Sequence, residues 1–299
     1  MKSKRKVTKA VIPAAGFGTR FLPQTKAMPK EMLPVVDKPV IQYVVEECIA
    51  SGITDIILVT GYHKRSIEDH FDKPSRELVE LLEQAGESKR KYLEAVNDIY
   101  TQANFIYIRQ KGGYGNATPV KEAASIIGNE PFAVLWGDEF IYSDVKPRLK
   151  QCLEVFEEYG DPVISGVKIE KKEDLARYGI ADLEHVKGRV SKIKKIVEKP
   201  DPDKAPSNIA THGCYILTPD IFEVLENQKT GTGGEYYLPE AIDDLRKKGR
   251  TIYACEIEGG KYYDTGNKMG YMKTVVEFAL RHPDINGEFK AYLKSLDLK

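Results

Sequence analysis

The chain contains little cysteine. Its four cysteines, Cys48, Cys152, Cys214 and Cys255, lie far apart among 299 residues, with no C-x-x-C pair and no histidine cluster nearby. Structural zinc sites need cysteines at short spacings, and disulfide frameworks belong to small, cysteine-rich chains. The spacing therefore argues against both, and we expect reduced and mostly buried thiols.

An excess of charge is absent too, and so are long apolar runs. The 45 basic and 45 acidic residues cancel, so no strong field attracts nucleic acid, although a local basic pocket for a phosphorylated substrate is still allowed. No apolar run approaches the roughly 20 residues that span a bilayer. We therefore expect a cytoplasmic protein with neither a nucleic-acid nor a membrane partner.

Strands and helices alternate along the first half of the sequence. Buried strands are predicted at 7–14, 55–61, 104–110 and 132–138, with helices at 39–52, 65–71 and 119–128. Such alternation is typical of a parallel sheet covered by helices. Residues 75–97 are charged and predict an exposed helical excursion.

The second half has a different order and spacing of predicted strands and helices. After Pro162 the strands at 163–169, 180–183 and 190–197 are separated by short turns, which indicates antiparallel pairing. Helices at 220–226, 237–248, 268–282 and 288–296 and a strand at 252–257 follow. The predicted fold is α/β: a Rossmann-like open mixed, mostly parallel sheet with helices on both faces, in a single domain over residues 1–299.

A glycine-rich turn, Ala15-Gly16-Phe17-Gly18-Thr19-Arg20, follows the first strand. Glycines let a backbone approach a polyphosphate, and ligands bind beyond the carboxyl ends of such strands. A P-loop would need Gly-Lys-Ser/Thr, and a dinucleotide fingerprint would need a third glycine where Phe21 stands. Taken alone, the turn is equally consistent with a tight structural turn whose charges face solvent.

Longer motifs shift this balance. The string from Gly16 to Pro23 is followed by Thr25-Lys26-Ala27-Met28-Pro29-Lys30-Glu31-Met32-Leu33-Pro34, and later by Val197-Glu198-Lys199-Pro200 and by Asp264-Thr265-Gly266-Asn267. Together they resemble the signature of the sugar-nucleotide pyrophosphorylases. The Pro-Lys-Glu-Met-Leu-Pro form resembles the bacterial UTP–glucose-1-phosphate uridylyltransferase branch, whereas the thymidylyltransferase branch typically has Ser-Lys-Gln-Leu-Leu-Pro.

The resemblance implies a reaction in which glucose 1-phosphate attacks the α-phosphorus of UTP, with Mg²⁺ as cofactor. It also implies a nucleotide-binding half (7–162) and a sugar-phosphate-binding half (163–299). We expect a homo-oligomer, either dimer or tetramer, although the sequence does not reveal which. The nucleotide site would comprise Ala14, Ala15, Gly16, Gly18, Thr19, Arg20, Lys30, Gln110 and Gly115. The sugar phosphate would be bound by Gly179, Glu198 and Lys199, the metal by Asp138 and Asp264, and catalysis would depend on Arg20, Lys30 and Lys199.

The chain departs from the family pattern in places. The loop Gln110–Pro119 is about two residues short, with Tyr114 for Leu and Asn116 for His; Cys214 replaces Arg, and Thr265 replaces Cys. The altered loop leaves a dTTP-using thymidylyltransferase as an alternative. A catalytically silent binding or regulatory subunit and a dinucleotide-dependent oxidoreductase are further alternatives, disfavoured by the full set of charged motif residues and by the missing third glycine.

Overall fold

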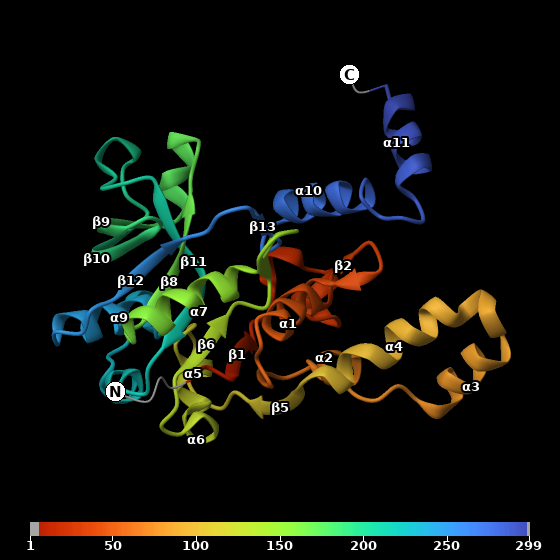
Figure 1. The fold of residues 1–299 in the computed structure, drawn as a ribbon, viewed down its shortest axis with the longest axis horizontal. Coiled ribbons are helices and arrows are strands. Elements are labelled where there is room, and N and C mark those ends of the chain that lie inside the picture. Colours follow the sequence, from red (N-terminus) through yellow and green to blue (C-terminus); the bar gives the residue numbers. More distant parts are fainter. Residues whose placement is uncertain (1–5, 298–299) are drawn as a thin grey trace.

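A nine-stranded sheet runs through the computed structural model, which describes residues 6–297 (Figure 1). Its strand order is β5-β4-β1-β6-β11-β8-β12-β10-β9. The strands are β1 (Lys9–Ala14), β4 (Asp55–Thr60), β5 (Asn104–Arg109), β6 (Phe132–Leu135), β8 (Val163–Lys168), β9 (Gly179–Lys187), β10 (Val190–Glu198), β11 (Ile209–Leu217) and β12 (Tyr253–Glu256). Two-stranded sheets pair β2 (Pro34–Val35) with β3 (Lys38–Pro39) and β7 (Glu139–Tyr142) with β13 (Lys261–Asp264).

Parallel pairing dominates the first half of the sheet. β1 lies between β4 and β6 and runs parallel to both, and β5 extends the parallel set beyond β4. β1 and β4 are almost wholly buried, as continuous apolar strands of a doubly covered sheet must be. Their carboxyl ends, Ala14 and Thr60, are directly opposite each other, so the loops that follow share one edge.

The second half is mixed. β11 runs antiparallel to both β6 and β8, and β10 runs antiparallel to β12 and β9, while β8 and β12 are parallel. The α/β class and the mixed sheet are therefore confirmed. Most of the parallel pairing lies at the end of the sheet that contains β5, β4, β1 and β6. The antiparallel texture predicted after Pro162 is confirmed as well.

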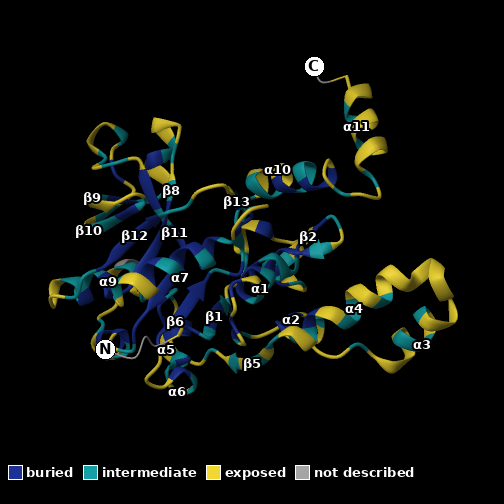
Figure 2. Cartoon of the chain, viewed as in Figure 1, coloured by how far each residue is buried: buried dark blue, intermediate teal, exposed yellow. Residues whose placement is uncertain are grey.

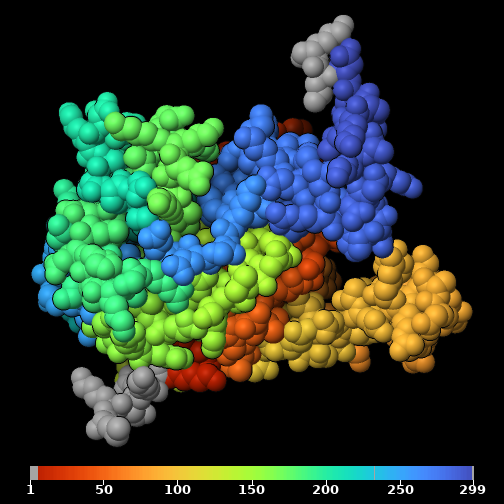
Figure 3. Space-filling view, turned by 45° about the horizontal axis from the view of Figure 1, so that its top comes forward, coloured from red at the N-terminus to blue at the C-terminus, as the bar shows by residue number. Residues whose placement is uncertain are grey.

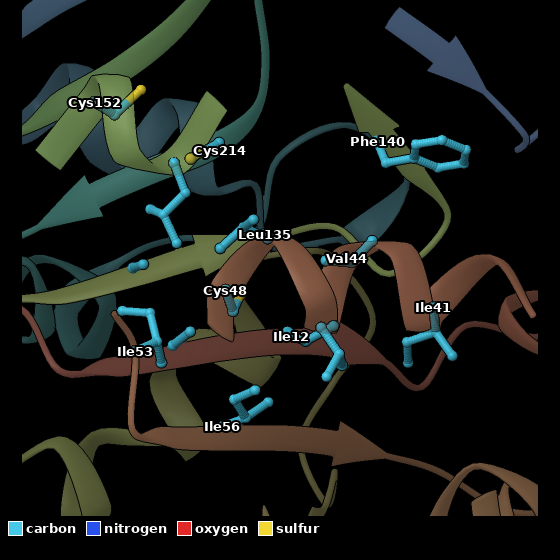
Figure 4. Packing of buried hydrophobic residues seen from close by; sticks show 14 of the residues in the cluster. Ile12, Ile41, Val44, Cys48, Ile53, Ile56, Leu135, Phe140, Cys152 and Cys214 are labelled. Carbon is cyan, nitrogen blue, oxygen red and sulfur yellow. The ribbon is translucent and has the colours of Figure 1, made fainter. Parts of the chain in front are cut away.

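Helices cover both faces of the sheet and bury two apolar clusters. One face is packed by α1 (Val40–Ala50), α7 (Arg148–Tyr159) and part of α10 (Lys268–Ala279), and the other by α5 (Thr118–Glu122), α6 (Ala124–Ile127), α8 (Ile221–Asn227) and α9 (Leu238–Lys247). Figure 4 shows Ile12 of β1, Ile56 of β4 and Val44 of α1 in the first cluster. Their burial positions the loops at the sheet edge.

All four cysteines are buried and free. Cys48, Cys152, Cys214 and Cys255 belong to the same apolar cluster, although they come from four different elements. Figure 4 shows the first three of them. Their expected burial is thus confirmed. Burial away from water raises the pKa of the Cys48 thiol, which keeps it in the neutral form.

A helical arm projects from the body (Figure 1). After α2 (Arg65–His70), α3 (Arg76–Gln84) and α4 (Arg90–Gln102) form it, and Ile99 is the one buried residue among the residues of these two helices (Figure 2). This confirms the expected exposed excursion. The arm and α11 (Asn286–Ser295) protrude at the same end of the molecule (Figure 3), and Lys91 of the arm pairs with Asp284 just before α11. No helix within residues 6–297 is long and apolar enough to cross a membrane.

Candidate active site

The glycine-rich turn joins β1 to a short 3₁₀ helix at Thr19–Phe21. Gly18 has a φ of 65° and its carbonyl accepts a 2.7 Å hydrogen bond from Oγ1 of Thr25. A side chain at Gly18 would be strained in this left-handed conformation and would crowd Lys30. The turn therefore needs glycine for its shape, and Lys30 lies across it rather than in solvent.

Lys30 is paired with Asp138. Its Nζ lies 2.6 Å from Oδ2 of Asp138, and both side chains are about one-quarter exposed (25% and 24%). Burial lowers the pKa of Lys30, but Asp138 and Glu31 together more than offset it, so the net pKa is raised. Burial raises the pKa of Asp138, but the Lys30 ammonium outweighs it and the net pKa is lowered. Both groups are therefore charged at neutral pH.

A second, deeper ion pair stands beside the first. Glu31 and Lys64 have side chains only 1% and 6% exposed, and the Lys64 Nζ lies 2.7 Å from Oε2 of Glu31. Burial raises the pKa of Glu31, against the lowering effect of Lys64. The segment Lys30–Met32 thus carries adjacent lysine and glutamate side chains, one paired with Asp138 at the site and one with Lys64 in the interior.

Asp264 reaches the same place from the other end of the chain. Pairing of β13 with β7 sets Asp264 opposite Glu139, which places it beside Asp138. Its carboxylate accepts hydrogen bonds from the Gly266 N–H at 2.9 Å and from the Asn267 amide at 2.7 Å. The Thr265 hydroxyl donates to the Asp138 carbonyl at 2.5 Å, which ties the two aspartate segments together.

Gly266 lies between the two aspartates and Arg20. A Cβ built on it would lie 3.2 Å from Oδ1 of Asp264, 3.3 Å from Oδ2 of Asp138 and 3.8 Å from a guanidinium nitrogen of Arg20. Arg20 also donates to the Gly266 carbonyl at 3.3 Å. Two carboxylates and one cation, predicted from motifs more than 100 residues apart, are therefore brought together.

The sugar-side residues face the same cavity. Glu198 is directly opposite Gly179 in the β9–β10 register, and a Cβ on Gly179 would approach Oε2 of Glu198 to 3.0 Å. A cavity of about 300 Å³ is lined by both of them, by Arg20 and by the two aspartates Asp138 and Asp264. Lys199 lines an adjoining cavity of about 710 Å³, which also borders Glu198. Lys199 has a φ of 45°, which is unusual for a residue with a side chain.

The two predicted base-contacting residues lie elsewhere. Gln110 follows β5, and its amide donates to the Gly113 carbonyl at 3.1 Å. Gly115 has a φ of 123°, and a Cβ there would come within 2.1 Å of the Tyr236 carbonyl oxygen. Neither residue lines the cavity that joins the aspartates to Glu198. The structure gives Gly115 a packing role, namely close contact with the backbone of Tyr236.

A buried polar cluster lies under the sugar side, and sequence reasoning missed its members Glu139, Tyr262 and Arg148. The Tyr262 hydroxyl donates to Oε2 of Glu139 at 2.7 Å, and the His212 ring stacks on Tyr262 at 4.3 Å. Arg148 is fully buried and approaches Glu139 to 3.8 Å. A side chain at Gly213 would collide with Glu139. In the sequence, the one feature that could have pointed to this cluster is that Glu139 directly follows the predicted site residue Asp138.

Burial governs the charge of this cluster. It raises the pKa of Glu139 to about 7, against the lowering effect of Arg148. It lowers the pKa of His212 to about 3, and Arg148 adds to that shift. His212, Glu139 and Tyr262 all line the 300 Å³ cavity. His212 is therefore a neutral, stacked side chain at neutral pH.

Comparison with known proteins identifies the family. The family model described as nucleotidyl transferase matches residues 9–279. The chain belongs to the nucleotidyl transferase family. This nucleotidyl transferase is 49% identical to the Staphylococcus epidermidis protein named UTP–glucose-1-phosphate uridylyltransferase, over 98% of its own length and 100% of the relative's.

Solved structures give the same result. The nucleotidyl transferase is 35% identical to the UTP-bound UGPase from Acinetobacter baumannii, with a TM-score of 0.88, covering 97% of this chain and 100% of that one. It is 38% identical to a UDP-glucose pyrophosphorylase complexed with UDP-glucose, with a TM-score of 0.83 over 92% of this chain and 100% of that one. The predicted family and the nucleotide-diphospho-sugar transferase type of fold are thereby confirmed.

Proposed function

We propose that this nucleotidyl transferase joins UTP and glucose 1-phosphate to give UDP-glucose and pyrophosphate. Support comes from relatives named UTP–glucose-1-phosphate uridylyltransferase, which are 48–49% identical over 98% of this chain. The observation that carries the proposal is the convergence of Arg20, Asp138, Asp264 and Glu198 on one cavity. The two aspartates could hold a divalent cation and Arg20 adds a second positive charge, so such a site could offset the repulsion between two phosphorylated substrates.

The reaction needs no activated side-chain nucleophile. The attacking phosphate oxygen of glucose 1-phosphate is already an anion, so the protein has to position it in line and to offset negative charge. The turn from Ala14 to Arg20 presents its backbone and the Arg20 guanidinium to the triphosphate. Lys30 lies across that turn and neutralises charge as pyrophosphate departs.

Asp138 and Asp264 fit a magnesium ion. Mg²⁺ commonly takes one or two protein carboxylates and completes its octahedron with water and phosphate oxygens. Two carboxylates would leave the other coordination positions to water and to phosphate oxygens of the substrates. When bound, Mg²⁺ would supply positive charge to the phosphates. The backbone N–H of Gly266 and the Asn267 amide orient Asp264 for this role.

The sugar phosphate occupies the second half of the chain in this proposal. Gly179 and Glu198 contact glucose hydroxyls, and Lys199 binds the phosphate from the adjoining cavity. Residues 7–162 then serve the nucleotide and residues 163–299 the sugar phosphate. A cytoplasmic location and a homo-oligomer, dimer or tetramer, belong to the proposal as expectations from the sequence.

The altered base loop keeps dTTP as a second candidate nucleotide. Tyr114 and Asn116 stand where the family pattern has Leu and His. The loop is fixed by other means, because Asn116 accepts a 2.7 Å hydrogen bond from the Leu238 N–H. A thymidylyltransferase therefore stays the alternative within the same chemistry.

Pyrophosphate release tests the proposal directly. Purified protein would be incubated with Mg²⁺, glucose 1-phosphate and each of UTP, dTTP, ATP, CTP and GTP, and parallel reactions would omit the sugar phosphate. We expect release with UTP that depends on glucose 1-phosphate. Preference for dTTP would support the second candidate, and no release with any nucleotide would leave the silent binding subunit.

A further inference from the structure

Two exposed aromatic side chains meet between the nucleotide-side loops. Phe17, in the glycine-rich turn, is 64% exposed, and Tyr114, in the loop after β5, is 65% exposed. Their ring centroids are 6.1 Å apart and the planes are tilted by 53°. Because β4 lies between β1 and β5 in the sheet, this contact bridges the space beyond the carboxyl end of β4.

The backbone that carries Tyr114 is fixed on both sides. The Glu122 carboxylate accepts hydrogen bonds from the N–H groups of Lys111 and Gly112, at 2.8 and 2.6 Å. The carbonyl of Tyr114 itself accepts one from the Tyr236 N–H at 2.9 Å. The loop is therefore held in place while the Tyr114 ring extends from it into solvent.

Exposed aromatic rings at fixed positions are suited to binding flat ligands. A nucleobase presents a π-face to an aromatic side chain whatever its hydrogen-bonding edge. Tyr114 is also a departure from the family pattern, which has Leu at this position. The chain thus offers an aromatic surface at the place where the proposed nucleotide site meets solvent.

We propose that Phe17 and Tyr114 form an aromatic clamp that packs against the base of the bound nucleoside triphosphate. This inference rests on the proposed function and deepens it. Gln110 sits at the start of the same loop and reads the edge of the base through its amide, whereas the clamp contacts the face. Face contact adds affinity for every nucleotide and discriminates little between uracil and thymine.

Steady-state kinetics of Tyr114→Leu, Phe17→Leu and the double variant test the clamp. We expect each single substitution to raise KM for UTP roughly five- to fifty-fold, within the range of base–aromatic stacking. KM for glucose 1-phosphate should change less than two-fold. The UTP-to-dTTP ratio of kcat/KM should stay constant, and Tyr114→Phe should restore KM for UTP.

The two rings act as one unit in this proposal, so the double variant should be little worse than the poorer single variant. Tyr92→Leu is the matched control, since Tyr92 is exposed on the helical arm and should leave both KM values unchanged. Equal changes in both KM values, no change in either, or failure of Tyr114→Phe to rescue would overturn the clamp.

A binding measurement separates the clamp from the reaction. Calorimetric titration of wild-type and Tyr114→Leu protein with UTP and Mg²⁺ should show the same five- to fifty-fold loss of affinity. A wild-type protein that binds UTP but releases no pyrophosphate would refute the proposed function and leave the clamp standing. Equal UTP affinity of the two proteins would refute the clamp and leave the function standing.

Discussion

Lys30 and Asp138 form an ion pair, with 2.6 Å between Nζ of the lysine and Oδ2 of the aspartate. One comes from the signature segment after the glycine-rich turn, the other from the loop after β6. In the proposed reaction each has another partner: Lys30 a phosphate, and Asp138 a magnesium ion. The ion pair thus keeps both groups charged at neutral pH and fixes their relative positions at the proposed site.

Replacing either aspartate with asparagine should remove most turnover. Loss of a carboxylate charge from a shared Mg²⁺ site forfeits several kcal/mol of transition-state stabilisation, so we expect kcat to fall roughly a hundred-fold or more in Asp138→Asn and in Asp264→Asn. The double variant should lose little beyond either single one, because both act on one ion. Magnesium titrations of the rate check this, with Asp98→Asn on the arm as a control. An unchanged magnesium dependence in one variant would remove that aspartate from the metal site.

Lys199→Met should impair the use of glucose 1-phosphate more than the binding of UTP. A charge-assisted phosphate contact is worth about 1.5–3 kcal/mol, or roughly ten- to a hundred-fold in KM. Methionine keeps much of the apolar stem and removes the charge. Lys194→Met is the control, because Lys194 lies in β10, which ends just before Lys199, and is paired with Asp182 at 3.1 Å. If the affinity for UTP fell as far as that for the sugar phosphate, Lys199 would have another role.

Removing one partner of the buried Glu31–Lys64 pair should destabilise the protein far more than removing both. Removing one partner strands a charge in the interior, so we expect Lys64→Met to lower the free energy of unfolding by about 3–5 kcal/mol. The double variant Glu31→Gln, Lys64→Met should recover much of this loss, since it leaves no unpaired charge. Urea denaturation at neutral pH measures both. A loss under about 1 kcal/mol in Lys64→Met would show that Glu31 is protonated or hydrated.

His212 should make the protein less stable as the pH falls. Its pKa is about 3 in the fold against an ordinary value of 6.5, because burial disfavours the imidazolium. Between these values the unfolded chain binds a proton that the folded chain refuses, so His212 by itself lowers the free energy of unfolding by about 1.4 kcal/mol per pH unit. Glu139, whose pKa is raised from 4.5 to about 7, contributes the opposite slope between pH 7 and 4.5. The stabilisation is complete above pH 6.5. Relative to the wild type, the free energy of unfolding of His212→Gln should rise by about 1.4 kcal/mol per pH unit as the pH falls from 6 to 4.5, with the exposed His185→Gln as the control.

Continuous apolar runs made the strands of the first half predictable. β1 and β4 lie within one or two residues of the predicted ranges, because strands buried on both faces leave an uninterrupted signal. β11 and α7 were not assigned. β11 is broken by the register shift between Thr211 and Tyr215, and α7 buries the polar side chains of Arg148 and Gln151. Polar residues that are buried with partners erase the periodicity on which sequence reasoning depends.

The site, too, was predictable only in part from the sequence. Short motifs pointed to Arg20, Lys30, Asp138 and Asp264, and the structure brings these four together. The sequence could not show which of them pair, because Lys30 and Asp138 are 108 residues apart and meet only through the order of the strands. Gly115 illustrates the converse: its motif predicted a base contact, while the structure explains the glycine by its approach to Tyr236.

The choice between UTP and dTTP is the sharpest test of the proposed activity. Uracil and thymine present the same hydrogen-bonding edge, so the Gln110 amide binds either and discriminates neither. Discrimination must come from the thymine methyl group or from the ribose 2′-hydroxyl that dTTP lacks. A missing or extra methyl group is worth about 1–3 kcal/mol, whereas a site built to pair with a hydroxyl rejects its absence by orders of magnitude.

We therefore expect kcat/KM for UTP to exceed that for dTTP by at least about ten-fold, mainly through the 2′-hydroxyl. The nucleotide dUTP separates the two causes, because it lacks the hydroxyl and also lacks the methyl group. If the hydroxyl decides, dUTP should behave like dTTP. If dUTP behaves like UTP while dTTP is rejected, a methyl-sized restriction around Gly113 and Tyr114 is the discriminator, and Tyr114→Leu should then relax it. A dTTP rate equal to or above the UTP rate would refute the uridylyltransferase assignment, and the nucleotidyl transferase chemistry of Arg20, Lys30 and the two aspartates would still stand.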